Sequence, residues 1–194
     1  MGCSGHFCYG PYIPPGGGIG GTIGYRFCFS NNTEMIVKEN GKELKRQVSD
    51  IKVGDLVLTL NGNQKVFSKV LENTKNEGIF EFYEIKIKDE KSNICSITVT
   101  GNHTMIIFEK ENETKFKFAN ELAIGDILRT NNGLFKIFEI GHKKMNNSYK
   151  LKVEEGTVLA NNILVSTIYL EGNKNIKHYG KVLDSVKIPI ENKN

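Results

Sequence analysis

Short segments in which apolar and polar residues alternate recur through the middle of the chain, and they are rich in β-branched and aromatic residues. This alternation is typical of strands with one buried face. It predicts strands at residues 56–58, 82–87, 97–100 and 135–138. Asn61-Gly62 and Asn132-Gly133 lie next to such segments and are strong signals for hairpin turns. Helix signals are limited to single turns at residues 48–51 and 119–122, so the sequence predicts an all-β fold.

One segment of this pattern occurs twice. Residues 51–67 match residues 122–138 without a gap, and seven of the 17 positions are identical. Both copies contain a Gly-Asp pair, Gly54-Asp55 and Gly125-Asp126, which we interpret as a turn entering a strand and not as a catalytic feature. The repeat indicates two similar β subdomains related by a pseudo-twofold axis.

The two ends of the chain differ from this middle part. Residues 1–24 hold nine of the 20 glycines and three of the four prolines, and a stretch such as residues 14–18 cannot continue a helix or a central strand. We therefore expect residues 1–27 to be a flexible leader and residues 28–170 to be the folded body. Residues 171–194 form a short polar tail.

Charge and composition exclude several classes of protein. The net charge is +4, and lysines alternate with acidic residues, as in residues 86–91, which is typical of a solvated face and not of a nucleic-acid site. No apolar run is long enough to span a membrane. The N-terminus lacks the basic and apolar regions of a secretory signal. We expect a cytoplasmic monomer, or an extracellular protein if the chain is a fragment.

The four cysteines, at positions 3, 8, 28 and 95, do not have the spacing of a disulfide scaffold. Cys3, His6, Cys8 and Cys28 could form a zinc site, but their spacing is not that of a standard finger and the glycine-rich surroundings favour disorder. Met1-Gly2-Cys3 is similar to an acylated N-terminus, although position 6 is His where Ser or Thr is required. We expect no metal and no cofactor.

The candidate chemistry lies at Cys28, Thr100 and His103. Cys28 is at the junction of leader and body, and Thr100 and His103 end a predicted strand, three residues apart. Taken singly, such a cysteine is usually a small buried hydrophobic residue. A single histidine at a strand end is usually structural or exposed.

Five ordered segments give these residues a context: residues 28–37, residues 49–58, residues 97–107 with Thr100 and His103, residues 121–128 and residues 156–169. Together and in this order they resemble the Hint domains, the self-processing modules of hedgehog proteins and inteins. The resemblance covers about residues 28–170. It implies a flat all-β horseshoe with internal twofold symmetry, in agreement with the repeat.

The resemblance also implies a reaction. The Cys28 sulfur attacks the carbonyl carbon of Phe27 in an N-to-S acyl shift, which converts the peptide bond into a thioester. A thiolate held next to its own preceding carbonyl loses little entropy on attack. A histidine that titrates near neutral pH, His103, supplies the proton that the leaving nitrogen needs. Thr100 hydrogen-bonds the amide or holds the imidazole.

Departures from the family limit the second step. Inteins end in His-Asn, but residues 165–167 read Val-Ser-Thr and Asn161 and Asn162 lie too early to substitute, so we expect no splicing. The Asp that activates a sterol in hedgehog proteins is missing from residues 70–75, where Glu72 is either a substitute or a surface acid. We expect water or a small nucleophile to cleave the thioester, with the leader as the substrate.

Two other functions stay open. The chain could be an inactive Hint-like β scaffold that serves as a binding module, or a conventional Cys-His hydrolase that acts on other substrates. The place of Cys28 at the leader junction favours self-cleavage over the hydrolase.

Overall fold

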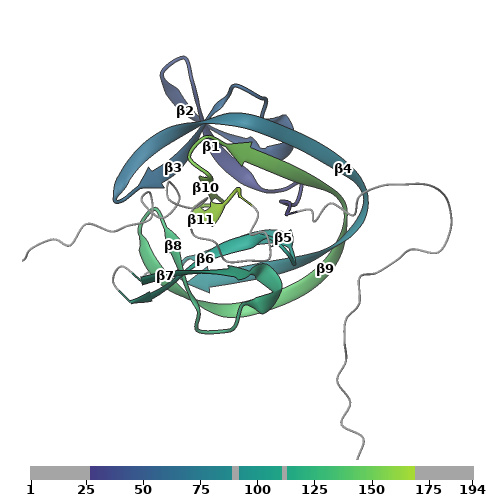
Figure 1. The fold of residues 1–194 in the computed structure, drawn as a ribbon, viewed down its shortest axis with the longest axis vertical. Helices are drawn as coiled ribbons and strands as arrows, with labels where there is room; N and C mark the ends of the chain where they lie inside the picture. Colours follow the sequence, from purple (N-terminus) through teal and green to yellow (C-terminus); the bar gives the residue numbers. More distant parts are fainter. Residues whose placement is uncertain (1–26, 89–91, 111–112, 169–194) are drawn as a thin grey trace, which may run out of the picture.

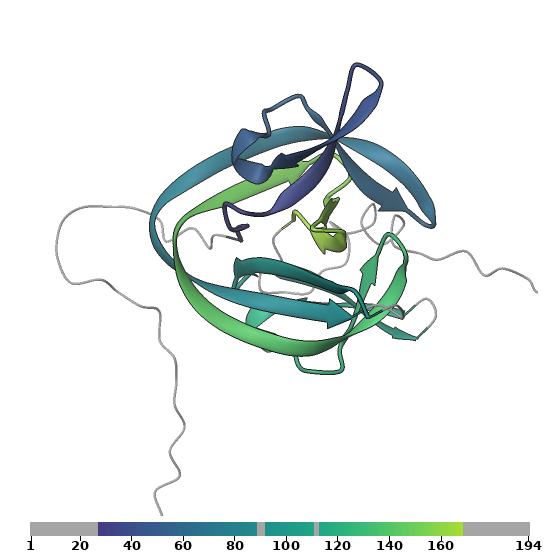
Figure 2. The same cartoon turned by 180° about the vertical axis from the view of Figure 1, so that it is seen from behind.

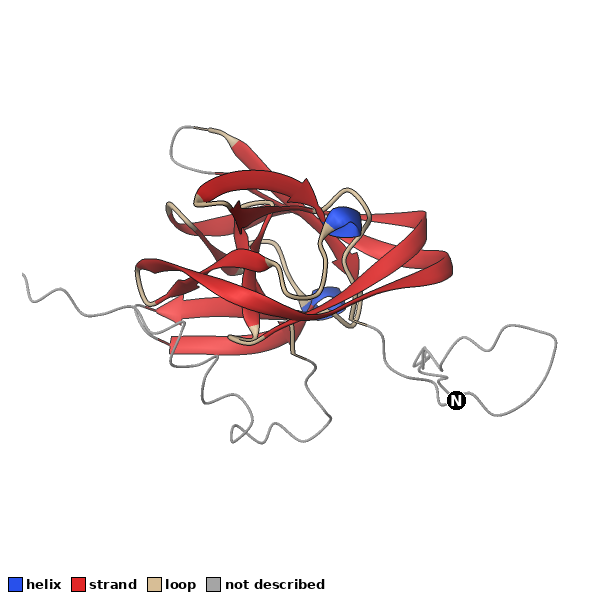
Figure 3. Cartoon of the chain, turned by 90° about the horizontal axis from the view of Figure 1, so that it is seen from above, coloured by secondary structure: helices blue, strands red, loops and turns tan. Residues whose placement is uncertain are grey.

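The computed structural model describes residues 27–88, 92–110 and 113–168. The expected leader, apart from Phe27, and the expected tail lie outside the described residues. Strands make up most of the described chain, with two single turns of 3-10 helix, η1 (Val48–Asp50) and η2 (Ala119–Glu121), where the sequence predicts helical turns (Figure 3). The all-β prediction is confirmed.

In the described residues, eleven strands form one antiparallel sheet system. Their bounds are β1 (Glu34–Glu39), β2 (Lys42–Gln47), β3 (Leu56–Asn61), β4 (Gln64–Lys88), β5 (Ile94–Thr100), β6 (Thr104–Lys110), β7 (Glu113–Phe118), β8 (Ile127–Thr130), β9 (Gly133–Val153), β10 (Thr157–Ala160) and β11 (Ile163–Ser166). The strand order is β10-β1-β3-β4-β9-β8-β11-β6-β7, with β2 added to β1 and β5 added to β4. Because β10 also pairs with β11, the sheet closes on itself.

The long strands β4 and β9 pair along most of their length and curve together round one side of the molecule, with β10 and β11 near its centre (Figures 1 and 2). Three register shifts interrupt this pairing, after Val70, after Asn76 and after Lys86. Such bulges increase the local twist and bend a strand. They allow two strands of 25 and 21 residues to follow the curve of the body.

The repeated Gly-Asp pairs form the same turn in both copies. Gly54 and Gly125 have φ of 95° and 96°, values that favour glycine. The Asp55 carboxylate accepts a hydrogen bond from the backbone of Lys52 (2.9 Å), and the Asp126 carboxylate accepts one from the equivalent Ala123 (2.9 Å). The interpretation of these pairs as turns entering strands is therefore confirmed.

The two copies of the repeat, residues 51–67 and 122–138, do not stay structurally equivalent through their hairpin turns. The β3–β4 turn closes at the pair Asn61 and Gln64, whereas the β8–β9 turn already closes at Thr130 and Gly133. The N–H of Ile137 donates to the Asp126 carbonyl as the N–H of Val70 donates to the Asp55 carbonyl. Val70 and Ile137 are thus structurally equivalent, whereas the gapless alignment makes Val66 the equivalent of Ile137. The alignment is therefore wrong after the hairpin turns. The twofold axis itself stays a prediction.

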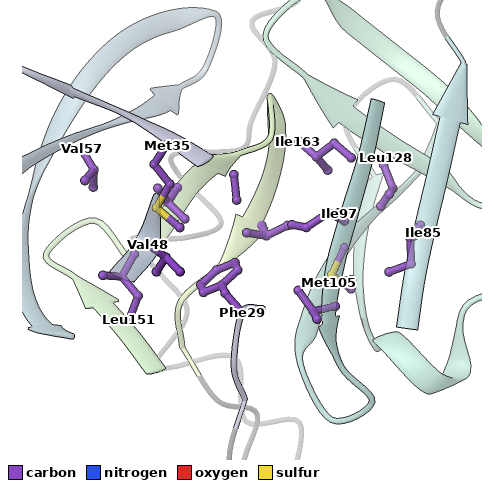
Figure 4. Close-up of a cluster of buried hydrophobic side chains, with 14 of the residues drawn as sticks. Phe29, Met35, Val48, Val57, Ile85, Ile97, Met105, Leu128, Leu151 and Ile163 are labelled. Atoms are coloured by element: carbon purple, nitrogen blue, oxygen red, sulfur yellow. The ribbon is translucent and has the colours of Figure 1, made fainter. Parts of the chain in front are cut away.

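A large buried cluster occupies the interior and includes Phe29. Phe29 lies between Val48 and Leu151 on one side and Ile97 and Met105 on the other (Figure 4). A second cluster is formed by Leu58, Leu60, Ile106, Phe108, Leu159 and Leu164. Burial of Phe29 fixes the residue next to Cys28 within the body.

No helix in the described part of the chain is long and apolar enough to cross a membrane.

Candidate active site

Cys28 lies in a short extended segment between β5 and β9. Phe29 exchanges two backbone hydrogen bonds with Tyr149 of β9, at N···O distances of 2.8 and 2.9 Å. On the opposite side, the Cys28 carbonyl accepts a hydrogen bond from the Thr100 N–H of β5 at 3.0 Å. The body therefore holds this segment from both sides, and the Cys28 thiol is completely buried.

The Thr100 side chain contacts the nitrogen of the bond that the sequence analysis expects to break. The Cys28 N–H donates to Thr100 Oγ1 at 2.9 Å, with both groups buried. The Thr100 hydroxyl also lies 3.5 Å from the Cys28 carbonyl oxygen. This arrangement fixes the plane of the Phe27–Cys28 peptide group relative to β5.

A tight turn brings His103 to the same place. The His103 N–H donates to the Thr100 carbonyl at 2.9 Å. A Cβ atom on Gly101 within this turn would lie 2.8 Å from Cε2 of Tyr83, so the turn can approach Tyr83 only because residue 101 is glycine. The Thr100-x-x-His103 spacing therefore places both side chains beside Cys28.

The His103 imidazole is fully buried among aromatic rings. Its centroid lies 4.6 Å from that of Phe29 and 6.3 Å from that of Phe27, in edge-to-face arrangements. Burial lowers the pKa of His103 to about 4, and the nearby backbone of Ser166 and Cys28 offsets this only in part. The expectation that His103 titrates near neutral pH is thus wrong, because burial disfavours the imidazolium. At pH 7 only about one molecule in a thousand carries the proton.

The imidazole is also short of hydrogen bonds. Among the described residues neither His103 nitrogen has a partner of ordinary geometry, although the backbone of Cys28 and Ser166 lies close enough to favour the protonated ring. A buried polar atom without a partner is uncommon and is often part of a functional site. A neutral imidazole with an available nitrogen can accept a proton from a neighbour.

Asn76 is a site residue that the sequence analysis missed. Its side-chain Nδ2 donates to Cys28 Sγ at 3.5 Å. Asn76 comes from β4, immediately before a bulge, and its register partner on β9 is Ser148. The Ser148 hydroxyl is buried and has no partner in the described part of the chain. No sequence motif marks Asn76, because only the pairing of β4 with β9 brings it to Cys28.

Comparison with known proteins gives the family. The family model of the Hint module matches residues 21–182, which is most of the chain. The chain belongs to the Hint family. The match begins before Cys28 and extends beyond residue 170. No match is found among the curated proteins.

Solved structures with the Hint fold agree with this assignment. A crystal structure of an intein from a hyperthermophile has a TM-score of 0.62 at 15% identity and covers 72% of this chain and 99% of its own. The bacterial intein-like domain from Clostridium thermocellum has a TM-score of 0.55 at 22% identity and covers 73% and 98%. The transcription factor IIB Mvu mini-intein has a TM-score of 0.59 at 18% identity, with 73% and 99% covered. These likenesses confirm the predicted all-β Hint fold, whereas the horseshoe shape and the internal symmetry stay predictions.

The end of β11 lies beside the site of this Hint module, but its hydroxyl groups are engaged locally. Ser166 Oγ donates to the Ile168 carbonyl at 3.1 Å and accepts from the Ile168 N–H at 3.0 Å. Thr167 Oγ1 accepts from the Val153 N–H at 3.4 Å. Asn161 lies in the β10–β11 turn, where its side chain bonds the backbone of Glu34 and Ser96. These contacts give each of the three side chains a structural role.

Glu72 lies near the site but is paired. Its two carboxylate oxygens lie 3.0 and 3.1 Å from the Lys150 Nζ, and each side chain is 36% exposed. Lys150 in turn places its ammonium 5.9 Å from the centroid of the Phe27 ring. Glu72 therefore contacts the site through Lys150 and Phe27, so neither of the two interpretations from the sequence is settled.

The possible zinc site and the acylated N-terminus concern Met1, Gly2, Cys3, His6 and Cys8, which lie outside the described residues. Within the described ranges no cluster of His, Cys, Asp and Glu side chains could hold a metal ion. Cys95 is half-buried and free.

Proposed function

We propose that this Hint module cleaves its own chain between Phe27 and Cys28. The observation that carries the proposal is the hydrogen bond of the Cys28 N–H to Thr100 Oγ1, at 2.9 Å, in a buried site that also holds the Cys28 thiol and the His103 imidazole. The nitrogen that leaves, the sulfur that attacks and a proton acceptor are thus collected at one peptide bond.

In the first step neutral His103 accepts the proton of the Cys28 thiol. The amide of Asn76, 3.5 Å from Sγ, stabilises the resulting thiolate because an N–H donor favours the charged form. The sulfur then attacks the carbonyl carbon of Phe27, and the π electrons of the carbonyl move to its oxygen. Attack is intramolecular, so orientation and not collision limits the rate.

In the second step the carbon–nitrogen bond breaks. The imidazolium of His103 returns its proton to the Cys28 nitrogen, which becomes an amine, and the acyl group stays on sulfur as a thioester. Burial favours this return, because it disfavours the charged imidazole. Thr100 acts as the acceptor that keeps the N–H oriented while the amide plane is lost. One proton has then moved from sulfur to nitrogen.

Water or a small nucleophile resolves the thioester. The nucleophile attacks the Phe27 carbonyl carbon, the carbon–sulfur bond breaks, and the Cys28 sulfur regains a proton. We expect neither splicing nor sterol transfer. Ser166 lacks a side-chain amide that could cyclise, and the Glu72 carboxylate is paired with Lys150.

Intact-mass spectrometry tests the proposal. The purified chain is incubated with and without dithiothreitol, and a body beginning at Cys28 is the expected product. His103→Gln should slow its appearance by about 10²–10⁴-fold, the usual contribution of general acid–base catalysis. His142→Gln is the matched control, because it removes a histidine from outside the site. A wild-type chain that stays full-length under thiol treatment would contradict self-cleavage and favour the inactive binding scaffold.

The burial of the site bears on the alternative of a hydrolase acting on other proteins. Cys28 and His103 are both completely buried, with Phe27 packed against the imidazole. Within the described part of the chain the sulfur therefore presents no exposed surface to a substrate from another molecule. The bond that the site can reach is the one already inside it.

A further inference from the structure

The side chain before the proposed cleavage bond is itself held by the body. Phe27 is only 8% exposed, although it belongs to the segment that would be released. The ring lies edge-to-face with His103, at a centroid distance of 6.3 Å and an interplanar angle of 72°. The Lys150 ammonium lies 5.9 Å from the ring centroid. Residues of two different elements, the β5–β6 turn and β9, thus contact one side chain.

Lys150 is positioned for this contact by Glu72. The ion pair joins β9 to β4, with Nζ 3.0 and 3.1 Å from the two carboxylate oxygens. An ammonium near an aromatic ring is attracted by the negative charge of the ring face. An aliphatic side chain has no such charge. The edge contact with His103 likewise depends on a ring. Both contacts therefore distinguish an aromatic residue from an aliphatic one of similar size.

The contacts of the Phe27 ring affect the proposed reaction because they restrict the position of the Phe27 carbonyl group. The other half of the peptide bond is fixed by the backbone of Cys28, through the bonds to Thr100 at 2.9 and 3.0 Å. The carbonyl carbon must still be presented to the sulfur. Small displacements from the attack geometry are costly in intramolecular reactions. A docked ring restricts the acyl side of the bond and keeps this carbon in place.

We propose that His103 and Lys150, with Lys150 held by Glu72, form a subsite for an aromatic side chain immediately before the cleaved bond. The module thereby selects a leader whose last residue is aromatic. This inference rests on the proposed self-cleavage. Lys150 and Glu72 act as specificity-determining and positioning residues and take no part in proton transfer.

The first test measures single-turnover cleavage rates for three residues at position 27. Replacing the ring by Phe27→Leu should slow cleavage by about 10-fold, a product of factors of about 2–5 for each ring contact. Phe27→Tyr should stay within about 3-fold of wild type, because it keeps the ring.

A double-mutant cycle assigns the effect to Lys150. In a Lys150→Met background the penalty for Phe27→Leu should fall to about 3-fold, because one of the two aromatic contacts is already lost. Lys144→Met is the matched control. Lys144 also lies on β9 and pairs with an acid, Glu81, but it is 72% exposed, and its loss should leave the 10-fold preference intact. Equal rates for Phe, Leu and Tyr at position 27, or a preference unchanged by Lys150→Met, would overturn the subsite.

A measurement independent of cleavage separates the two proposals. In a Cys28→Ala chain, which cannot form the thioester, the ε-methylene protons of Lys150 should show an upfield NMR shift from the Phe27 ring. That shift should vanish in the Phe27→Leu double variant. If the Cys28→Ala chain shows the shift but the wild-type chain is never cleaved, the docking of Phe27 is supported and self-cleavage is refuted. If the wild-type chain is cleaved but the Cys28→Ala chain shows no shift, the docking is refuted and self-cleavage is unaffected.

Discussion

Acidification should destabilise the fold through His103, and the structure sets the size of the effect. The pKa of His103 is about 4 in the folded chain, against an ordinary value of 6.5. Between these values the unfolded chain binds more protons, so stability is complete above pH 6.5 and is lost as pH falls toward 4. At 1.36 kcal/mol per pKa unit the whole loss is about 3 kcal/mol, of which about 2 kcal/mol falls between pH 7 and pH 5.

The assay is urea unfolding of a Cys28→Ala chain, in which cleavage cannot interfere. The free energy of unfolding is extrapolated at pH 7 and at pH 5, where most carboxylates are still ionised. His103→Gln in the same background should abolish most of the 2 kcal/mol difference, whereas His142→Gln should retain it. If the two variants lose the same stability on acidification, His103 is not the group whose protonation opposes folding, and the pKa argument fails.

Four further outcomes follow from the contacts. Cys28→Ala should abolish cleavage at the Phe27–Cys28 bond, as seen by intact mass, because the substitution removes the attacking thiol. Thr100→Val keeps the shape but leaves the Cys28 N–H without its acceptor, and should cost about 1–3 kcal/mol in urea unfolding and slow cleavage. Asn76→Ala should move the pH–rate profile of cleavage to higher pH, because the thiolate loses its N–H donor; an unchanged profile would exclude that role. Arg129, which donates from a buried position to the Gly62 carbonyl and to Asn63, holds the β3–β4 turn against β8, and Arg129→Met should destabilise the fold by about 1–3 kcal/mol.

The short elements were predictable because their signals are local. The turns at residues 48–51 and 119–122 and the Gly-Asp turns depend on a few neighbouring residues, and they form where the sequence places them. The strand at residues 82–87 is only the last part of β4, which begins at Gln64. Much of β4 between these points is polar and exposed, so no alternation marks it as strand. Its structure is stabilised by pairing with β9, a partner far away in the sequence.

The candidate site was predictable to a similar extent. The order of segments led to Cys28, Thr100 and His103, and the structure brings them together. The low pKa of His103 and the contact of Asn76 with the sulfur both depend on tertiary packing, which spacing along the chain does not encode. The ion pair of Glu72 with Lys150 is of the same kind, because it joins β4 to β9.

The buried hydrogen bond between the Cys28 N–H and Thr100 has a consequence for the reversibility of the proposed reaction. Once the acyl group has moved to sulfur, this nitrogen is the terminal amine of the body, and in the intact chain it lies 2.9 Å from a buried hydroxyl. Burial favours a neutral amine over an ammonium. A neutral amine next to its own thioester attacks it readily and restores the peptide bond. Under the proposed mechanism we therefore expect the two forms to exchange within the buried site. We expect this exchange to end only when a nucleophile from solution removes the leader, so that the supply of the nucleophile would set the time at which the chain is cut.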